Sequence, residues 1–409
     1  MLHDPEFQAL LAARFTNSIA LGALATVVAF QVYDLTRDPL FLGWLGLAEG
    51  LPALALALFG GHIADRRDRR SIVIVTSLAA TLCAALLSLF AAGRAVGLLG
   101  IFGVIAATGV ASGFERPALS ALAAQIIPRA ETVRGASYAS SVGTTGGILG
   151  PAIGGIAIAI LGVATTYLAI AVVLALSTAF FLFIRRKPIP ERAEGDGETM
   201  LQSIAAGIRF VRRSPVLLGS MSLDLFAVFF GGAIALLPIF ASDILKVGPA
   251  GLGLLRTAPS VGALAVMLIA TRRPPSRSAG PILLLCVAGF GVSMLVFGLS
   301  TTFWVSMLAL FVSGVTDGVS VIIRTSIVRI FTPDALRGRV SSVNFVFIGA
   351  SNELGAFESG FLARILGTVP SVVVGALVTL GVVGAVALGV PELRRMNLDR
   401  ASPADLAEA

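Results

Sequence analysis

Charged residues are scarce in this sequence of 409 amino acids. Asp, Glu, Lys and Arg make up 13% of it, whereas a soluble domain carries about 25%. Hydrophobic residues make up 56%, and the mean hydropathy is +0.93. This composition excludes soluble enzymes, nucleic-acid-binding proteins and secreted disulfide-rich domains, because too few polar residues are available to cover their surfaces. Apolar segments of about 20 residues, the length that spans a bilayer, recur along the whole chain and indicate a polytopic membrane protein.

Cysteine and histidine are also rare, with two of each. Cys83 and Cys286 fall inside apolar segments, where they cannot form a disulfide framework or a metal site. His3 and His62 lie outside the predicted spans, so a proton relay within the membrane must use carboxylates. The sequence contains no G-x-x-x-x-G-K-[ST] nucleotide-binding loop and no H-E-x-x-H motif. We therefore expect neither an enzyme nor an ATP-driven pump, and no metal or cofactor.

Twelve apolar segments are long enough to be membrane-spanning helices. We place them at residues 15–33, 42–60, 72–92, 96–118, 137–160 and 165–184, and at 217–240, 253–270, 281–299, 303–325, 343–365 and 370–390. A polar segment with prolines and acidic residues separates the sixth span from the seventh. The sequence thus predicts an all-α membrane protein with a six-helix half at 1–184, a cytoplasmic linker at 185–214, a second six-helix half at 215–390 and a tail at 391–409.

The positive charges are distributed unevenly about the predicted spans. Most of the 30 Lys and Arg residues, which give the chain a net charge of +7, lie in the loops at one end of the spans, in the linker and near the termini. Loops rich in Lys and Arg remain in the cytoplasm during insertion, so both termini are predicted to be cytoplasmic. The basicity is then a topology signal with lipid headgroups as its neighbours, and we expect no nucleic-acid partner.

The two halves carry traces of an internal repeat. At an offset of 205 residues, Gly109-Val110 matches Gly314-Val315. At an offset of 207, Pro52 matches Pro259, and Arg256 falls at the position of Glu49. Two parallel six-helix repeats are typical of secondary transporters, in which the halves move about a central binding site.

A charged motif follows the second predicted span. Residues Gly61-His-Ile-Ala-Asp65-Arg66-Arg67-Asp68-Arg69-Arg70 fit the pattern G-x-x-x-D-R-x-x-R-R, which resembles the signature of the major facilitator superfamily. The resemblance implies a major facilitator fold and a conformational switch, formed by Gly61, Asp65, Arg66, Arg69 and Arg70, that locks the cytoplasmic side in the outward-open state. Glycines at 60–61 would permit close helix contact, and Asp68 stands where the superfamily usually has glycine. An ordinary basic turn is the alternative.

The fifth predicted span contains a complete G-x-x-x-G-P-x-x-G-G motif at Gly146, Gly150, Pro151, Gly154 and Gly155. This motif resembles the one associated with exporters (antiporters) in the same superfamily. Its glycines permit close helix contact, and the proline removes a backbone hydrogen bond so that the helix can bend. The resemblance implies a dry helix interface that prevents protons from leaking. Generic glycine packing is the alternative.

Other segments narrow the resemblance within the superfamily. They are Asp4-Pro-Glu-Phe7 followed by Ala13-Arg14-Phe15, the amphipathic segment 201–210, Arg337-Gly-Arg339-Val340 and Pro391-Glu-Leu-Arg-Arg395. These segments are similar to those of bacterial siderophore (enterobactin) exporters, and the macrolide efflux proteins share parts of the pattern. They say little about the substrate, because they lie mostly in loops.

Ionisable residues within membrane spans cost roughly 2.5–3.5 kcal/mol each to insert and are therefore candidates for function. The candidates for proton coupling are Glu49, Glu353, Asp317 and Asp224. The candidates for lining the substrate cavity are Arg14, Asn17, Arg256, Asn352, Glu115 and Arg116. The resemblance implies that the second and eleventh spans pack together, so that Glu49 and Glu353 could share a proton and Arg256 could pair with either. A buried structural hydrogen bond is the alternative for Glu49 and Glu353, and a static helix–helix contact is the alternative for Asp317. A local ion pair is the alternative for Glu115 and Arg116.

We expect a secondary active transporter, a monomer in the bacterial cytoplasmic (inner) membrane. It would export small amphipathic molecules of the drug or siderophore type by alternating access, in exchange for protons. Phe supplies 25 of the aromatic residues, which suits an apolar cavity that accepts varied (multidrug) substrates. An acidic siderophore would favour a cationic cavity, for which Arg14, Arg116 and Arg256 are the candidates. The alternative is a proton-independent uniporter or importer of a small solute, against which the motif of the fifth span argues.

Overall fold

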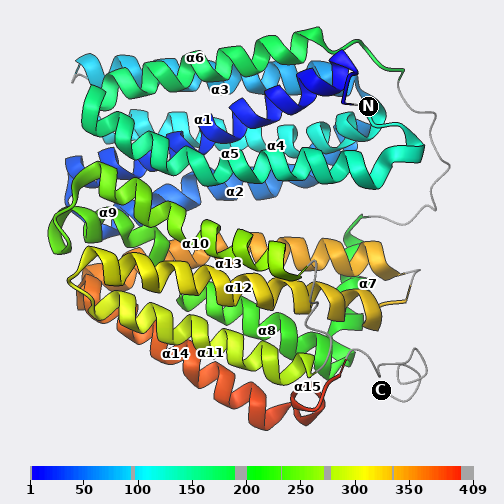
Figure 1. Cartoon of the computed structure of the whole chain (residues 1–409), viewed down its shortest axis with the longest axis vertical. Coiled ribbons are helices and arrows are strands. Elements are labelled where there is room, and N and C mark those ends of the chain that lie inside the picture. The colour runs from blue at the N-terminus through cyan, green and yellow to red at the C-terminus, as the bar shows by residue number, and fades with distance from the viewer. Residues whose placement is uncertain are drawn as a thin grey trace. The chain divides into compact units, whose positions relative to one another are not determined.

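The computed structural model describes residues 2–93, 97–188, 200–231, 233–270, 278–333 and 336–397. These residues form long helices joined by short connections (Figure 1). They divide into two compact units. The first unit is Met1–Arg192 with Leu237–Thr257, and the second is Ala193–Leu236 with Ala258–Ala409.

The first unit contains six long helices and a shorter segment from later in the chain. The long helices are α1 (Pro5–Thr36), α2 (Pro39–Arg66), α3 (Arg69–Gly93), α4 (Leu98–Ile126), α5 (Thr132–Leu161) and α6 (Val163–Phe183), with a 3₁₀ turn η1 (Arg129–Glu131) before α5. The later segment comprises α9 (Leu237–Ile239), the π-helix η3 (Phe240–Ile244) and the start of α10 (Gly248–Ala270). Within this unit α1 packs against α5 and α6, α2 packs against α4, and α3 packs against α4 and α6.

The second unit begins with the short amphipathic helix α7. Its helices are α7 (Met200–Arg213), α8 (Pro215–Phe230), η2 (Ala233–Leu236), the remainder of α10, α11 (Ala279–Leu299), α12 (Phe303–Phe331), α13 (Arg337–Leu366), α14 (Thr368–Gly389) and α15 (Pro391–Arg394). Helix α11 packs against α12 and α14, and α13 packs against α7, α8 and α14. The predicted span 217–240 is not one continuous helix, because α8 ends at Phe230 and 3₁₀, α and π turns follow it.

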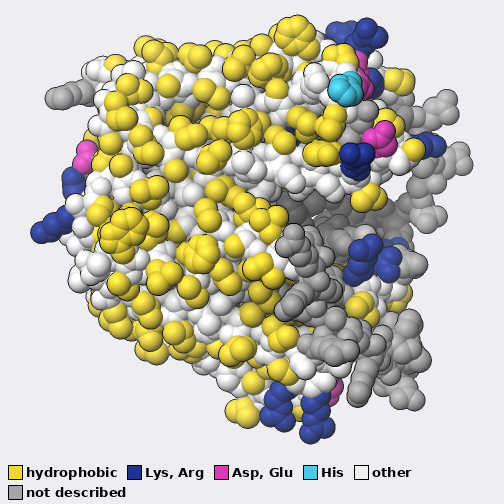
Figure 2. Space-filling view, in the orientation of Figure 1, with side chains coloured by type: hydrophobic (Ala, Val, Ile, Leu, Met, Phe, Trp, Pro, Cys, Tyr) yellow, Lys and Arg dark blue, Asp and Glu magenta, His cyan; other side chains and the backbone are white. Residues whose placement is uncertain are grey.

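Eleven helices of the described residues are long and apolar enough to cross a membrane. The remaining long helix, α13, coincides with the eleventh predicted span and carries Arg337, Glu353, Glu358 and Arg364 among its residues. Apolar side chains cover the middle of the helices in Figure 2, and the charged ones gather near helix ends. The prediction of an all-helical membrane protein is confirmed.

Three spanning helices begin with the same N-terminal motif, in which the side chain of the N-cap residue accepts a hydrogen bond and the next residue is proline. Asp4 accepts a hydrogen bond from the backbone N–H of Glu6 at 2.9 Å, and Asp38 accepts one from Leu40 at 3.0 Å. Ser214 caps α8 in the same way. Proline is favoured directly after the cap because its missing N–H would have no partner within the helix. These caps set the positions at which α1, α2 and α8 begin.

Candidate substrate and proton-coupling site

A polar pair connects α1 to α4 inside the first unit. The amide nitrogen Nδ2 of Asn17 donates a hydrogen bond to Oε1 of Glu115 at 2.7 Å, and both residues are buried, with exposures of 6% and 5%. The amide oxygen of Asn17 is itself buried and has no hydrogen-bond partner in the described part of the chain. A proton on Glu115 would supply the donor that this oxygen lacks. Glu115 is thus directed toward α1.

A cavity of about 220 Å³ lies beside this pair, between α1, α2 and α4. Its walls are mostly apolar, and its polar groups come from α2 and α4. The lining residues are Leu21, Leu24, Ala25, Val28, Leu45, Glu49, Ile105, Thr108, Ser112 and Arg116. An apolar cavity with a few convergent polar groups is the usual form of a small-molecule site. The sequence placed Glu49 and Arg116 in separate roles, whereas the structure brings them to one cavity.

Glu49 is accessible from this cavity and interacts electrostatically with two guanidinium groups, those of Arg256 and Arg116. Arg256 reaches it from α10 and is held by a hydrogen bond from Nη1 to the carbonyl oxygen of Ala25, at 3.2 Å. Arg14, also on α1, is half-buried and lies near Gly143 of α5. The cavity is therefore lined by one carboxylate, Glu49, and one guanidinium, that of Arg116, and a second guanidinium, that of Arg256, interacts with the carboxylate.

Glycines allow α2 and α4 to lie in close contact. A β-carbon at Gly109 would overlap the carbonyl oxygen of Glu49, and one at Gly60 would overlap that of Gly113. By contrast, a β-carbon at Gly61 would meet nothing within 4 Å. Of the two glycines expected to permit close approach, only Gly60 is in tight contact.

The glycine motif of α5 faces two different helices. Gly146, Gly150 and Gly154, spaced four residues apart, line α1: a β-carbon at Gly150 would lie 2.6 Å from the carbonyl oxygen of Ile19, and one at Gly154 would lie 2.8 Å from Cα of Ala23. Gly155 lies against α10, where a β-carbon would overlap the carbonyl oxygen of Pro249. Pro151 lies within the helix between these contacts. The motif therefore forms a close interface on two sides of α5.

We expect Gly155→Ala to destabilise the first unit by about 1–3 kcal/mol, because the added methyl group forces α5 and α10 apart. Gly147→Ala is the matched control, because a β-carbon at Gly147 meets no atom within 4 Å. Thermal unfolding of the two purified variants in detergent would measure the difference. Equal unfolding temperatures would show that the contact at Gly155 carries no packing constraint.

A charged triad connects α8 to α12 inside the second unit. Arg324 forms an ion pair with Asp224, and both side chains are about nine-tenths buried. The second guanidinium nitrogen, Nη2, lies 3.6 Å from Oδ1 of Asp317, whose side chain is 48% exposed. Two carboxylates share one cation, so the triad holds a net negative charge unless a proton binds. Asp317 is the carboxylate of the two that is open to exchange.

The sequence prediction did not single out Arg324, which lies near the end of the tenth predicted span, 303–325. Helix α12 continues to Phe331, so Arg324 lies well inside the helix. Its spacing of seven residues from Asp317 puts both side chains on one face, two turns apart. This seven-residue spacing is the feature of the sequence from which the pairing of Asp317 with Arg324 could have been predicted.

One residue of each polar contact occupies a matching position in the repeat. Asn17 and Asp224 differ by 207 residues, the offset that also relates Glu49 to Arg256. Each unit therefore joins its first and fourth long helices through a buried polar contact, Asn17 to Glu115 in the first and Asp224 to Arg324 in the second.

Two of the predicted site residues, Asn352 and Glu353, lie on α13. Asn352 is exposed and donates to the carbonyl oxygen of Ile348 in its own helix, at 2.9 Å. Glu353 is half-buried. Because Glu49 and Glu353 belong to different units, their sharing of a proton stays a prediction.

The charged motif lies where α2 ends and α3 begins. Arg69 donates to the carbonyl oxygens of Ala64, at 3.1 Å, and Ala121, at 3.3 Å. Arg70 donates to that of Leu182 at 2.9 Å. Arg66 is the last residue of α2, and the side chain of Asp65 lies outside the described residues. The motif arginines thus tie α2 and α3 to α4 and α6.

Asp68, the departure from the superfamily pattern, has a structural role of its own. Its carboxylate accepts hydrogen bonds from the backbone N–H of Arg70, at 3.2 Å, and the hydroxyl of Ser71, at 2.6 Å. It therefore stabilises the start of α3, as acidic residues do at helix N-termini.

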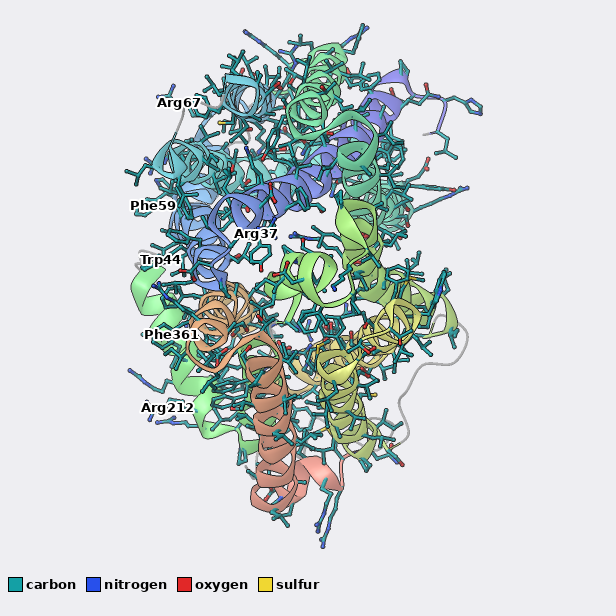
Figure 3. All side chains as sticks on the ribbon, turned by 90° about the vertical axis from the view of Figure 1, so that its left-hand side faces the viewer. Arg37, Trp44, Phe59, Arg67, Arg212 and Phe361 are labelled. Atoms are coloured by element: carbon teal, nitrogen blue, oxygen red, sulfur yellow. The ribbon has the colours of Figure 1, made fainter. Side chains whose placement is uncertain are left out.

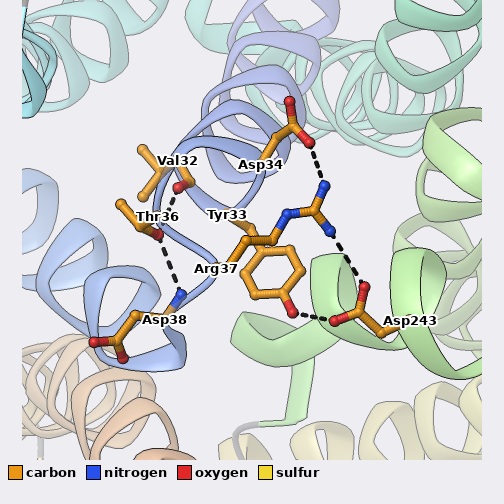
Figure 4. Close-up of polar contacts among 7 residues, drawn as sticks. All are labelled: Val32, Tyr33, Asp34, Thr36, Arg37, Asp38 and Asp243. Atoms are coloured by element: carbon orange, nitrogen blue, oxygen red, sulfur yellow. Dashed lines mark hydrogen bonds and ion pairs between the residues drawn. The ribbon is translucent and has the colours of Figure 1, made fainter.

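A second charged cluster lies at the end of α1 and comprises Tyr33, Asp34, Arg37 and Asp243 (Figure 4). The hydroxyl of Tyr33 donates to Asp243 on the π-helix η3. Arg37 lies 3.3 Å from Asp243 and 2.6 Å from Asp34, and its guanidinium stacks on the Tyr33 ring at 5.5 Å. Arg37 adopts φ +51°, a left-handed conformation that ends α1 and turns its side chain toward η3. Sequence reasoning did not single out this cluster.

Comparison with known proteins relates the chain to transporters. A family model described as Major Facilitator Superfamily matches residues 10–356. The enterobactin exporter EntS of Shigella flexneri is 25% identical over 401 residues, covering 96% of this chain and 93% of the relative. EntS of Citrobacter koseri is also 25% identical, covering 96% and 94%.

Solved transporters share the fold. A POT family transporter in complex with 5-aminolevulinic acid superposes with a TM-score of 0.75 at 13% identity, covering 95% of this chain and 96% of that one. The nucleoside transporter NupG gives a TM-score of 0.74 at 14% identity, covering 94% and 98%. At these identities the similarity shows the fold alone, and it confirms the predicted major facilitator fold.

Proposed function

The chain belongs to the Major Facilitator Superfamily, and from this premise we propose that it exports a small amphipathic molecule from the bacterial cytoplasm in exchange for protons. It is a multi-pass membrane protein and a secondary transporter, not an enzyme. The observation that carries the proposal is Glu49, an accessible carboxylate in an apolar cavity beside Arg256 and Arg116.

Glu49 is the residue at which substrate and proton are exchanged in this proposal. A substrate hydroxyl that donates a hydrogen bond to Glu49 binds the charged carboxylate more strongly than the protonated acid, because the charge strengthens the bond. Proton and substrate then compete for Glu49, which is the condition for antiport. Carboxylates inside membrane helices commonly act as such proton carriers.

The two guanidiniums favour an acidic or phenolic substrate. Arg256 and Arg116 can bind an anionic oxygen, and they would repel a lipophilic cation. The 25% identity to enterobactin exporters over nearly the whole chain supports the same substrate class. We therefore propose a catecholate-type siderophore ahead of a cationic drug.

Transport into inverted membrane vesicles tests this assignment. Vesicles that contain the protein should accumulate a catecholate siderophore when energised, and Arg256→Gln should reduce that accumulation. Accumulation of a lipophilic cation or a macrolide alone would replace the siderophore by a drug. Accumulation that ignores the pH gradient would favour the uniporter alternative.

We propose that the contacts of Tyr33 and Arg37 with Asp243 close the outer end of the pathway. Within the first unit these contacts join α1 to the segment Leu237–Thr257. The residues directly before and after this segment belong to the second unit. During alternating access this segment would separate from α1 and expose Val32, which is fully buried here.

Asp243→Asn is expected to raise the population of the outward-open state about two- to fivefold, because it removes an ion pair that is partly exposed to solvent. With Cys83 and Cys286 replaced by Ala, labelling of Val32→Cys by an impermeant thiol reagent would report the change. Asp34→Asn is the control, because it removes one negative charge from an ion pair that lies within α1 and does not connect α1 to η3. Equal labelling of Val32→Cys in both variants would contradict the proposed closure by Asp243.

A further inference from the structure

We propose that the groove between α7, α8 and α13 binds an anionic phospholipid, with its acyl chain in the groove and its headgroup on the arginines of α7. The groove has a volume of about 110 Å³ and lies wholly in the second unit. Its lining residues are Ile208, Val211, Arg212, Leu218, Met221, Ser222, Leu225, Val343 and Phe347.

The wall of the groove is a mostly apolar stripe. Leu218, Met221, Ser222 and Leu225 repeat on α8 at the three- and four-residue spacing that places side chains on one helix face. Val343 and Phe347, four residues apart, form the facing wall on α13. Leu218 and Phe347 remain exposed, at 44% and 40%. The groove is therefore open to a ligand that is apolar along its length.

The mouth of the groove is positively charged. Arg212 lines it, and Figure 3 shows this residue on the outer side of α7 with its side chain directed away from the neighbouring helices. Arg209 and Arg213 flank it, and all three side chains are exposed. In the part of the chain that the structure describes, none of the three forms an ion pair with a carboxylate. Helix α7 has no acidic residue in its first turn.

The position of α7 relative to the membrane matches the two parts of a phospholipid. Ser214 separates α7 from Pro215, where a membrane-spanning segment begins. Arg212 and Arg213 therefore lie at headgroup level, and the α8 side chains of the groove follow into the hydrocarbon region. Helix α7 is fixed there because Gly207 packs so closely on α13 that a β-carbon would lie 2.8 Å from the carbonyl oxygen of Arg339. Basic amphipathic helices at this level bind anionic lipids.

Native mass spectrometry of the full-length protein in detergent tests the proposal. Phosphatidylglycerol and phosphatidylcholine with the same acyl chains would be titrated separately. We expect tighter binding of phosphatidylglycerol, and a loss of about 30-fold in its affinity in the double variant Arg212→Gln/Arg213→Gln, at about fivefold for each charge. Phosphatidylcholine binding should not change in that variant.

Two further sets of measurements test the headgroup site and the acyl-chain groove separately. The double variant Arg394→Gln/Arg395→Gln removes the same charge from exposed residues of the same unit and should leave phosphatidylglycerol binding unchanged. Ser222→Phe fills the groove and should weaken both lipids, whereas free glycerol phosphate should not compete. Equal affinity for the two lipids, or phosphatidylglycerol binding that survives both the arginine and the groove substitutions, would overturn the proposal.

Discussion

Replacing Glu49 by glutamine is expected to abolish the dependence of transport on the pH gradient. Glutamine keeps the size of the side chain and can still form hydrogen bonds, but it cannot release or bind a proton. A proton-motive force of about 150 mV per proton supports a substrate gradient of roughly 300-fold. In Glu49→Gln, an imposed pH gradient should no longer drive accumulation, so the ratio of substrate concentrations across the membrane should fall to about one. The substrate should still reach the cavity.

Substrate accumulation against an imposed pH gradient measures this effect. Glu358→Gln is the matched control, because Glu358 is a carboxylate on α13 of the second unit, beside Ser359, and the proposed exchange does not use it. Unchanged proton dependence in Glu49→Gln would remove Glu49 from the mechanism. Loss of coupling in both variants would point to a general disturbance of the fold.

Replacing Arg324 by methionine is expected to destabilise the second unit by about 3–5 kcal/mol. The substitution keeps an extended apolar side chain but leaves Asp224, 11% exposed, without its cation. Removal of one partner from a buried ion pair costs this much because the remaining charge stays desolvated. Asp317 cannot compensate, because it is itself a carboxylate and would add repulsion.

A second substitution distinguishes the ion pair from simple packing. Asp224→Asn in the Arg324→Met background removes the stranded charge, so it should restore most of the lost stability. Thermal unfolding in detergent of the two single variants and the double variant completes the cycle. If the double variant is no more stable than Arg324→Met, the loss comes from packing and the triad has no electrostatic role.

The membrane helices could be predicted because hydrophobicity over about 20 residues is a strong local signal. Helix ends follow less directly from hydropathy, and Arg324, near the end of its predicted span, was not singled out. Helix α12 extends six residues beyond the predicted span 303–325, to Phe331, and Arg324 pairs with Asp224 on α8. Local hydropathy carries no information about a partner on another helix.

The site residues illustrate the same limit. Asn17, Glu115, Glu49 and Arg116 were singled out as ionisable or polar groups within spans. Their grouping depends on contacts between residues as far as 98 positions apart, which spacing along one helix cannot supply. Arg256 was related to Glu49 only through the 207-residue repeat.

The cluster at Tyr33 escaped prediction for a different reason. Asp243 and Arg37 lie at the ends of spans, where charged residues are common and carry no distinctive pattern. The π-helix that presents Asp243 follows a helix break after Phe230, and no motif in the sequence marks it. π-Helical turns are frequent at functional sites, so this irregularity is informative only once the structure is known.

Proton movement in proteoliposomes tests the central claim most directly. A pH-sensitive dye trapped inside would report while a catecholate siderophore is added to the purified protein in the absence of other gradients. The proposed antiport predicts proton flux opposite to the substrate, abolished in Glu49→Gln and retained in Glu358→Gln. Substrate movement without any proton flux in the unmodified protein would contradict it.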